Sequence, residues 1–175
     1  IVRAAHATGI QVVPIPGASA LIAALSASGL CDGPFYFSGF LPRENKPRAA
    51  AMRQLQAMRC TCVLYEAPHR IAKTLSALAE IMPEREACLA REITKLFETV
   101  LDGTLAAIAE KVAADPNQRK GEFVLIVAGA PENEDAALLE GRRLYAKLSE
   151  VMKPSQAAKI AADLSGAPRK ALYGG

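Results

Sequence analysis

The sequence predicts an α/β fold and, more specifically, the later part of an α/β enzyme, because short apolar segments alternate with helical patterns along the chain. Three observations carry this prediction. Residues 11–15 form an apolar run that ends in Pro-Gly and leads into a helix rich in small residues. Residues 61–65 have the pattern of a buried strand that runs straight into a helix, and residues 122–129 are the most apolar segment of the chain.

The first third of the chain predicts three helices and two strands. Residues 1–9 have the pattern of a helix already under way and stopped by Gly9; because the chain also lacks an initiator Met, we expect a preceding segment. The helix after Pro16-Gly17 is expected over 18–29. Alternating aromatic residues predict a strand over 35–40, and helical spacing of apolar residues predicts a helix within 41–59.

The remainder continues the alternation. After the strand at 61–65, Pro68 suits the first turn of a helix that reaches Ile81. We expect a strand from 88 to 95, a partner strand at 97–101 with Asp102-Gly103 as its turn, and a helix over 105–114 capped by Thr104. The strand at 122–129 should be central in its sheet. A linker, a helix from about 136 to 151 and two short helices around a Gly turn complete the chain.

Composition places the chain among globular proteins, since 51% of its 175 residues are hydrophobic. No apolar run approaches the roughly 18 residues needed to cross a bilayer, so a cytoplasmic protein without membrane contact is expected. The four cysteines show no Cys-x-x-Cys spacing and no histidine partner, which predicts reduced core thiols and no metal site.

Charge is distributed unevenly, although the net charge is only +3. Residues 101–140 hold three basic and eight acidic groups, whereas residues 141–175 hold seven and two. The segment 42–48 adds a cationic loop, interpreted either as a phosphate-contacting loop or as a solvated connection. The basic tail could read nucleic acid through its helical pair, or the pair could be a packing hairpin.

Functional side chains concentrate where the predicted strands end, which predicts a ligand cleft there. These segments are 16–20, 65–70, 91–95 and the approach to the strand at 122–129. Each also has an ordinary structural explanation. Glu66 and Arg70 could form an ion pair at a helix N-terminus, the charges of Arg91 and Glu92 could be solvated, and His69 could be an ordinary residue of a helix start.

Four motifs, taken in order, resemble one known family. They are Pro-Gly-Ala-Ser-Ala at 16–20, Tyr-Glu-Ala-Pro-His-Arg at 65–70, Ala-Arg-Glu-Ile-Thr-Lys at 90–95 and Gly-Glu-Phe-Val-Leu-Ile-Val-Ala-Gly at 121–129. Together they resemble the ribosomal RNA small subunit methyltransferase I (RsmI) family, of the tetrapyrrole-methylase-like class of S-adenosylmethionine enzymes. The resemblance spans essentially the whole chain. Ala67 and Ile93 depart from it, because the family usually has Ser and Leu at these places.

The resemblance implies the C-terminal domain of the tetrapyrrole methylase fold, a mixed sheet flanked by helices, followed by a small helical hairpin. Such enzymes hold S-adenosylmethionine between two domains, and the Gly-rich and Asp-Pro-Gly-type loops of the first domain are absent from this sequence. The chain is therefore expected to hold half of the cofactor site. The implied division is 1–16 for the end of the first domain, 17–130 for the methyltransferase domain, 131–152 for a linker and helix, and 153–175 for the helix-turn-helix-like hairpin. A homodimer is also implied.

The implied reaction transfers a methyl group from S-adenosylmethionine to the ribose 2′-oxygen of a cytidine in small-subunit (16S) rRNA, within the rRNA or the 30S subunit. By resemblance, the cofactor should be contacted by Ser19, Ala20, Tyr65, Ala90 and Phe123. The side chains expected to act in catalysis are Glu66, His69 and Lys95, with Glu92 as a further possible proton acceptor. A lysine can act as a base only if its surroundings lower its pKa. The cations expected to contact RNA are Arg43, Lys46, Arg48, Arg70 and Arg91.

Two other functions stay open at this point. One is a methylase that acts on a tetrapyrrole or another small substrate, which the same fold supports. The other is a non-catalytic RNA-binding fragment that uses its terminal hairpin. The basic tail and the cationic segment 43–48 favour an RNA substrate over a small one.

Overall fold

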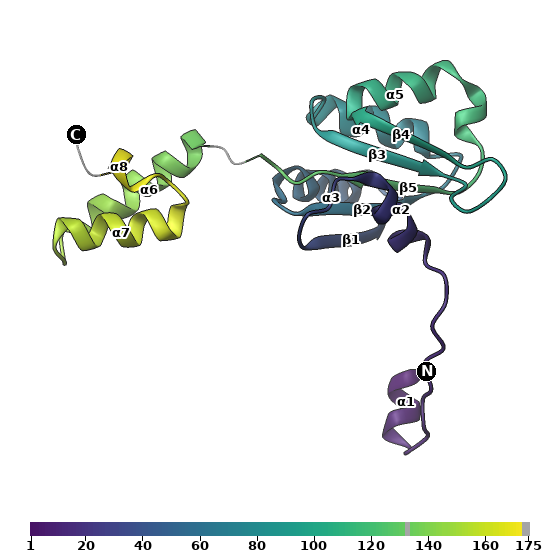
Figure 1. Ribbon diagram of the computed structural model, residues 1–175, viewed down its shortest axis with the longest axis horizontal. Coiled ribbons are helices and arrows are strands. Elements are labelled where there is room, and N and C mark those ends of the chain that lie inside the picture. Colours follow the sequence, from purple (N-terminus) through teal and green to yellow (C-terminus); the bar gives the residue numbers. More distant parts are fainter. Residues whose placement is uncertain (132–133, 173–175) are drawn as a thin grey trace. The chain divides into compact units, whose positions relative to one another are not determined.

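The computed structural model describes residues 1–131 and 134–172 (Figure 1). It divides into two compact units, Ile1–Gly129 and Ala130–Gly175. The first unit contains the sheet and the functional residues predicted above. The second is helical.

The sheet of the first unit has five strands in the order β1-β2-β5-β3-β4. Their bounds are β1 Phe35–Phe40, β2 Thr61–Glu66, β3 Glu86–Arg91, β4 Thr99–Thr104 and β5 Phe123–Val127. β1 and β2 are parallel, and all other neighbouring pairs are antiparallel. Every residue of β5 is buried, as expected for an apolar strand with a neighbour on each side. The predicted mixed sheet and the central position of this strand are confirmed.

Three helices cover one face of the sheet, namely α3 (Asn45–Ala57), α4 (Ile71–Ile81) and α5 (Leu105–Ala114). Their apolar stripes and the inward residues of the strands form the larger hydrophobic cluster. α5 begins where predicted, because the Thr104 hydroxyl accepts a 3.2 Å hydrogen bond from the Ala107 amide. Because these helices pack on the face of the sheet, the ends of the strands are available for functional residues.

The opposite face is covered by α2 (Ala20–Ser28), whose Ala24 is fully buried against residues of β2, β3 and β5. α2 ends at Gly29, which has a φ of +64° and so adopts the left-handed conformation typical of helix C-caps. The first helix, α1 (Val2–Ala7), has no buried residue.

Two local predictions in this unit are wrong. Residues 11–15 are exposed and form no strand. Asp102-Gly103 is not a turn, since both residues lie within β4, paired with Cys88 and Ala87 of β3. The connection between β3 and β4 is instead the tight loop 92–98, so the strand predicted to reach residue 95 ends at Arg91.

The second unit contains α6 (Glu134–Ser149), α7 (Pro154–Ser165) and α8 (Arg169–Leu172), so the predicted pair of helices around a Gly turn is present (Figure 1). Its small cluster contains Ala161, Ala167 and Leu172. A Cβ on Gly141 of α6 would lie within 3.0 Å of side-chain atoms of Ser165, Ala167 and Leu172, so this glycine allows α6 to approach α7 and α8 closely. The predicted linker and hairpin also include residues 132–133 and 173–175, which lie outside the described residues.

Within the described ranges, no helix combines the length and the apolar character that crossing a membrane requires. Over the same ranges, no three His, Cys, Asp or Glu side chains gather closely enough to hold a metal ion.

Candidate active site at the strand ends

The strand register brings predicted functional segments together at one end of the central strands. Phe123, the first residue of β5, pairs with Glu66 at the end of β2 and with Arg91 at the end of β3. The carboxyl ends of β2 and β3 therefore flank the amino end of β5. Residues that are 57 positions apart along the chain, from 66 to 123, become direct neighbours.

A cavity of about 430 Å³ opens at this end of the strands. Four residues singled out in the sequence line it: Ala20, Tyr65, Glu66 and Phe123. Six more were not predicted as site residues: Phe40, Ala67, Pro68, Ile93, Glu122 and Val124. Most of these residues adjoin a predicted residue in the sequence. Their position at the end of a strand could therefore have identified them as candidates. The lining is mainly apolar, with two carboxylates, as in sites that bind small organic ligands.

Tyr65 joins the two elements that border this cavity. Its hydroxyl oxygen accepts a 3.2 Å hydrogen bond from the backbone N–H of Leu21, in the first turn of α2. Its ring packs edge-on against Phe37 at a centroid distance of 5.0 Å and lies 5.9 Å from Phe40. The tyrosine thus holds the start of α2 against the sheet and presents an aromatic face beside the cavity.

Glu66 is buried, with 4% of its surface exposed, and its carboxylate is already satisfied by protein groups. Oε1 accepts a hydrogen bond from the Ala67 N–H at 2.9 Å and lies 3.3 Å from Arg70 Nε, while Oε2 accepts from the Thr74 hydroxyl at 2.6 Å. A buried carboxylate with three such partners is typical of a structural anchor. The geometry favours a positioning role for Glu66.

Two of the cations predicted to contact RNA belong to the same network. Arg70 donates to the carbonyl oxygens of Leu41 at 2.8 Å and Pro42 at 3.4 Å, and Arg48 donates to Thr74 Oγ1 at 2.9 Å. These bonds connect the segment after β1 to α4. The network occupies both guanidinium groups with protein partners, so Arg48 and Arg70 are poorly suited to clamp a phosphate.

The predicted cationic loop 42–48 is shorter than expected, because α3 already begins at Asn45. Arg43 lies in the remaining loop and Lys46 in the first turn of the helix, and both are exposed. These two side chains keep the accessibility that contact with a phosphate requires.

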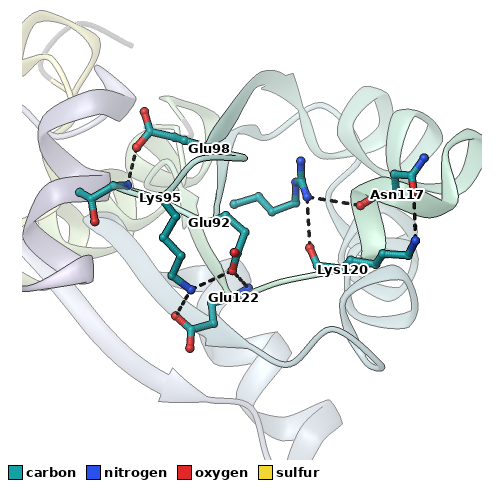
Figure 2. Close-up of polar contacts among 8 residues, drawn as sticks. Glu92, Lys95, Glu98, Asn117, Lys120 and Glu122 are labelled. Atoms are coloured by element: carbon teal, nitrogen blue, oxygen red, sulfur yellow. Dashed lines mark hydrogen bonds and ion pairs between the residues drawn. The ribbon is translucent and has the colours of Figure 1, made fainter.

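A compact ionic cluster joins the loop that follows β3 to Glu122, a lining residue of the cavity (Figure 2). Lys95 Nζ lies 2.9 Å from Glu92 Oε1 and 3.0 Å from Glu122 Oε2, and both carboxylates face it in the close-up. The hydrogen bond to Glu92, followed by that to Glu122, raises the pKa of Lys95. This shift is opposite to the one that a general base needs.

The loop is held by backbone contacts as well. The Glu92 N–H donates to the Glu122 carbonyl at 2.9 Å, and the Glu122 N–H donates back to Glu92 Oε1 at 2.8 Å. Gly121, with a φ of +98°, makes room for this exchange, since a Cβ there would lie 2.5 Å from Glu92 Cγ. Glu92 and Thr94 themselves have φ values of +50° and +65°, a conformation that side chains other than glycine rarely adopt.

Arg91 lies on the other side of this loop. Its Nε donates to Thr99 Oγ1 at 2.9 Å, and its Nη1 donates to the carbonyls of Asn117 at 3.4 Å and Lys120 at 3.3 Å. It thereby joins β3 and β4 to the 3-10 turn Pro116–Arg119. Arg91 also lines a second cavity, described below.

The remaining predicted residues are distributed around the first cavity. Ser19 is exposed at the N-cap of α2, next to Ala20 of the lining. Ala90 is 1% exposed and packs in the cluster beneath α2, so it supports the cavity from within the core. His69 is exposed in the turn before α4, one residue after Pro68 of the lining. α4 begins at Ile71, so the prediction that Pro68 lies in its first turn is wrong.

Comparison with known protein families gives two matches. Residues 1–109 match the family described as tetrapyrrole (corrin/porphyrin) methylases, and residues 135–174 match the RsmI C-terminal HTH domain.

Individual relatives agree with these matches. The chain is 57% identical over 176 residues to the ribosomal RNA small subunit methyltransferase I of Xylella fastidiosa strain 9a5c, covering 100% of this chain and 64% of the relative. It is 41% identical to the Neisseria meningitidis serogroup A protein of the same name, covering 99% and 60%. The chain thus spans less than two thirds of these relatives. Among solved structures, the methyltransferase CobJ shares the fold, with a TM-score of 0.51, 22% identity and coverage of 74% of this chain and 57% of that one.

Proposed function

Because the chain belongs to the tetrapyrrole methylase family, and within it to the ribosomal RNA small subunit methyltransferase I proteins, we propose that it is the substrate-side part of an S-adenosylmethionine-dependent rRNA methyltransferase. The proposed reaction transfers the methyl group to the 2′-oxygen of a cytidine ribose in small-subunit rRNA. The observation that carries the proposal is the cavity at the strand ends, because all four family-like motifs contribute to its lining, through Ala20, Tyr65, Ile93 and Phe123.

The lining of this cavity fits S-adenosylmethionine. An adenine ring needs an apolar slot with an aromatic neighbour, and the Tyr65 and Phe40 side chains with Phe123 and Val124 provide one. Ala20, at the start of α2, has a side chain small enough for a ligand to approach the helix backbone closely. When bound, the cofactor supplies an electrophilic methyl group. The protein residues would bind it, exclude water and orient the ribose hydroxyl.

Three side chains were expected to act in catalysis, and the geometry favours different roles for them. Glu66 anchors Arg70 and Thr74, and Lys95 is held as a cation between two carboxylates. His69 is exposed beside the lining residue Pro68, and histidine is the side chain best able to accept a proton near neutral pH. In this proposal His69 accepts the proton of the ribose hydroxyl, while Glu66 and Lys95 hold the walls of the site.

The rRNA would contact the exposed cations Arg43 and Lys46, together with the basic second unit, whose residues 141–175 carry seven basic and two acidic groups. In this proposal, the protein acts on the 30S subunit or its rRNA in the cytoplasm. It works as a homodimer and requires no metal ion for the methyl transfer.

The test uses the full-length protein with purified 30S subunits, 16S rRNA and methyl-labelled S-adenosylmethionine. Label should enter the rRNA, and mass spectrometry of nuclease digests should find it on a cytidine ribose. Label on a base would contradict the ribose assignment. Transfer to a tetrapyrrole and none to rRNA would favour the small-substrate methylase, while tight RNA binding without cofactor binding in calorimetry would favour a non-catalytic module.

The role of His69 is tested in the same assay by His69→Gln. We expect kcat to fall by about a hundredfold, the usual order for a lost general base, with an unchanged Kd for S-adenosylmethionine. An unchanged kcat and an unchanged pH profile would remove His69 from the mechanism.

A further inference from the structure

The loop 92–98 carries two large apolar side chains into solvent. Leu96 is 89% exposed and Phe97 is 69% exposed, although both lie only a few residues from the buried strand β3. A phenylalanine in solvent gains nothing from the hydrophobic effect. The ring and the neighbouring Leu96 are therefore accessible to a partner from outside this chain.

The loop is built to hold this position. Glu92 and Thr94 adopt left-handed backbone conformations, which are strained for residues other than glycine and persist only where surrounding contacts enforce them. The ion pairs of Lys95 with Glu92 and Glu122 hold one side of the loop in place (Figure 2). Across the loop, the Thr94 N–H donates to the Glu98 carboxylate. A strained loop fixed by this many polar contacts is typical of a binding site rather than of a simple connection.

Phe97 borders a second cavity, of about 400 Å³. Its lining consists of Arg91, Glu92, Phe97, Asn117, Lys120 and Gly121. The walls are fixed, because Arg91 is bonded to the carbonyls of Asn117 and Lys120.

Charge and position indicate the kind of ligand. The lining of the second cavity contains one carboxylate, Glu92, and two cations, Arg91 and Lys120, so positive charge exceeds negative charge there. Lys120 Nζ is held by a 3.1 Å hydrogen bond to Asn117 Oδ1. The two cavities are neighbours, since Ile93 and Glu122 line the first while Glu92 and Gly121 line the second.

We propose that Phe97 and Lys120 form a subsite for one nucleotide of single-stranded RNA next to the nucleotide that is methylated. The base stacks on the exposed ring of Phe97, and its phosphate contacts the Lys120 ammonium group. An aromatic platform beside a cation is the combination that binds unpaired nucleotides with little sequence preference. The subsite rests on the proposed RNA substrate and adds to it the residues that hold the neighbouring nucleotide.

The test compares Phe97→Leu and Phe97→Tyr in the full-length protein, using the transfer of labelled methyl groups to 30S subunits. Phe97→Leu removes the ring but keeps an apolar side chain, so we expect KM for the subunit to rise about tenfold, with kcat and Tm near those of the wild type. Phe97→Tyr keeps the ring and should keep KM. Lys120→Gln should raise KM and make the salt dependence of RNA binding less steep, whereas Lys120→Arg should not.

Different failures have different meanings. An unchanged KM in Phe97→Leu, with wild-type methyl transfer intact, overturns the subsite alone. A lower Tm or a changed oligomeric state in that variant, again with an unchanged KM, shows that Phe97 packs against protein and also overturns it. Absence of methyl transfer to rRNA and of RNA binding by the wild type overturns the proposed function and the subsite together.

Discussion

The hydroxyl of Thr74 lies between two charged groups, because it donates a 2.6 Å hydrogen bond to Glu66 Oε2 and accepts one of 2.9 Å from Arg48. Thr74 is 1% exposed, so water cannot replace either bond. This single buried hydroxyl connects the end of β2, the first turn of α4 and the first turn of α3. The stability and the geometry of the site depend on buried contacts of this kind between elements.

Replacing Thr74 by Val should therefore destabilise the first unit. The carboxylate of Glu66 would lose a buried donor, at a cost of about 1–3 kcal/mol in the free energy of unfolding. Thr74→Ser keeps the hydroxyl and is the matched control, with a smaller loss from the missing methyl group. Urea unfolding monitored by circular dichroism measures both variants, and equal stability of the Val and Ser proteins would contradict this account.

Replacing Gly121 by Ala should be more costly than the same change at Gly29. Both residues have positive φ, so both substitutions strain the backbone by about 1 kcal/mol. At Gly121 the new methyl group would also collide with Glu92, whereas at Gly29 no atom lies within 4 Å. Urea unfolding should show a difference of at least about 1 kcal/mol between the two variants. Equal losses would mean that Glu92 moves aside without cost.

The cluster around Lys95 should be complete only within a window of pH. The hydrogen bond from Lys95 lowers the pKa of Glu92 below its ordinary value of 4.5, so the contribution of Glu92 is present above that pH and is lost as pH falls through the lowered pKa. The pKa of Lys95 is raised above 10.5, so its contribution is present below that pH and is lost as pH rises through the raised pKa.

Carbon-13 NMR of the Glu92 carboxyl group measures the acidic limit directly. Its titration midpoint should lie below 4.5 and should move up toward 4.5 in Lys95→Met, which removes the cation and keeps a long side chain. A midpoint at or above 4.5 in the wild type would show that the pair is not formed in solution.

The four thiols should fall into two reactivity classes. Burial raises the pKa of Cys62 to about 11 and that of Cys88 to about 12, which leaves almost no thiolate at pH 8. Cys31 and Cys60 are only partly buried. Iodoacetamide at pH 8, followed by peptide mass spectrometry, should modify these two first and reach the buried pair only in urea. Equal rates for all four thiols in the native protein would contradict the assignment.

Sequence patterns predicted the elements whose signals are local and strong. The apolar run of β5 and the hydroxyl of Thr104 each determine their own surroundings, and both predictions are confirmed. The Asp102-Gly103 turn failed because the pairing of these residues with β3 outweighs a local turn preference. Residues 11–15 have a strand-like composition, but an apolar run forms a strand only where a neighbour accepts its hydrogen bonds.

In the candidate site too, local signals predicted some features, whereas others depend on contacts that only the fold creates. Strand-end position correctly predicted that Tyr65, Glu66 and Phe123 meet, because strand ends converge at one edge of a sheet. The spacing of Glu66 and Arg70 indicated their ion pair, which the structure contains. The sequence could not show that Arg70 also contacts Leu41, that Arg48 contacts Thr74, or that Gly121 and Glu92 touch. Those contacts join residues 26 to 29 positions apart, and only the folded backbone determines them.

The edge strand β1 has a consequence for handling the protein. It pairs only with β2, and its four aromatic residues are each at least 39% exposed, which is the combination that allows chains to join edge to edge. The irregular register at Gly39, with a φ of +67°, interrupts this edge after Phe37. At this edge of the sheet, the segment 35–37 therefore offers the regular template for pairing between chains, and substitutions there should change the tendency of the isolated chain to aggregate.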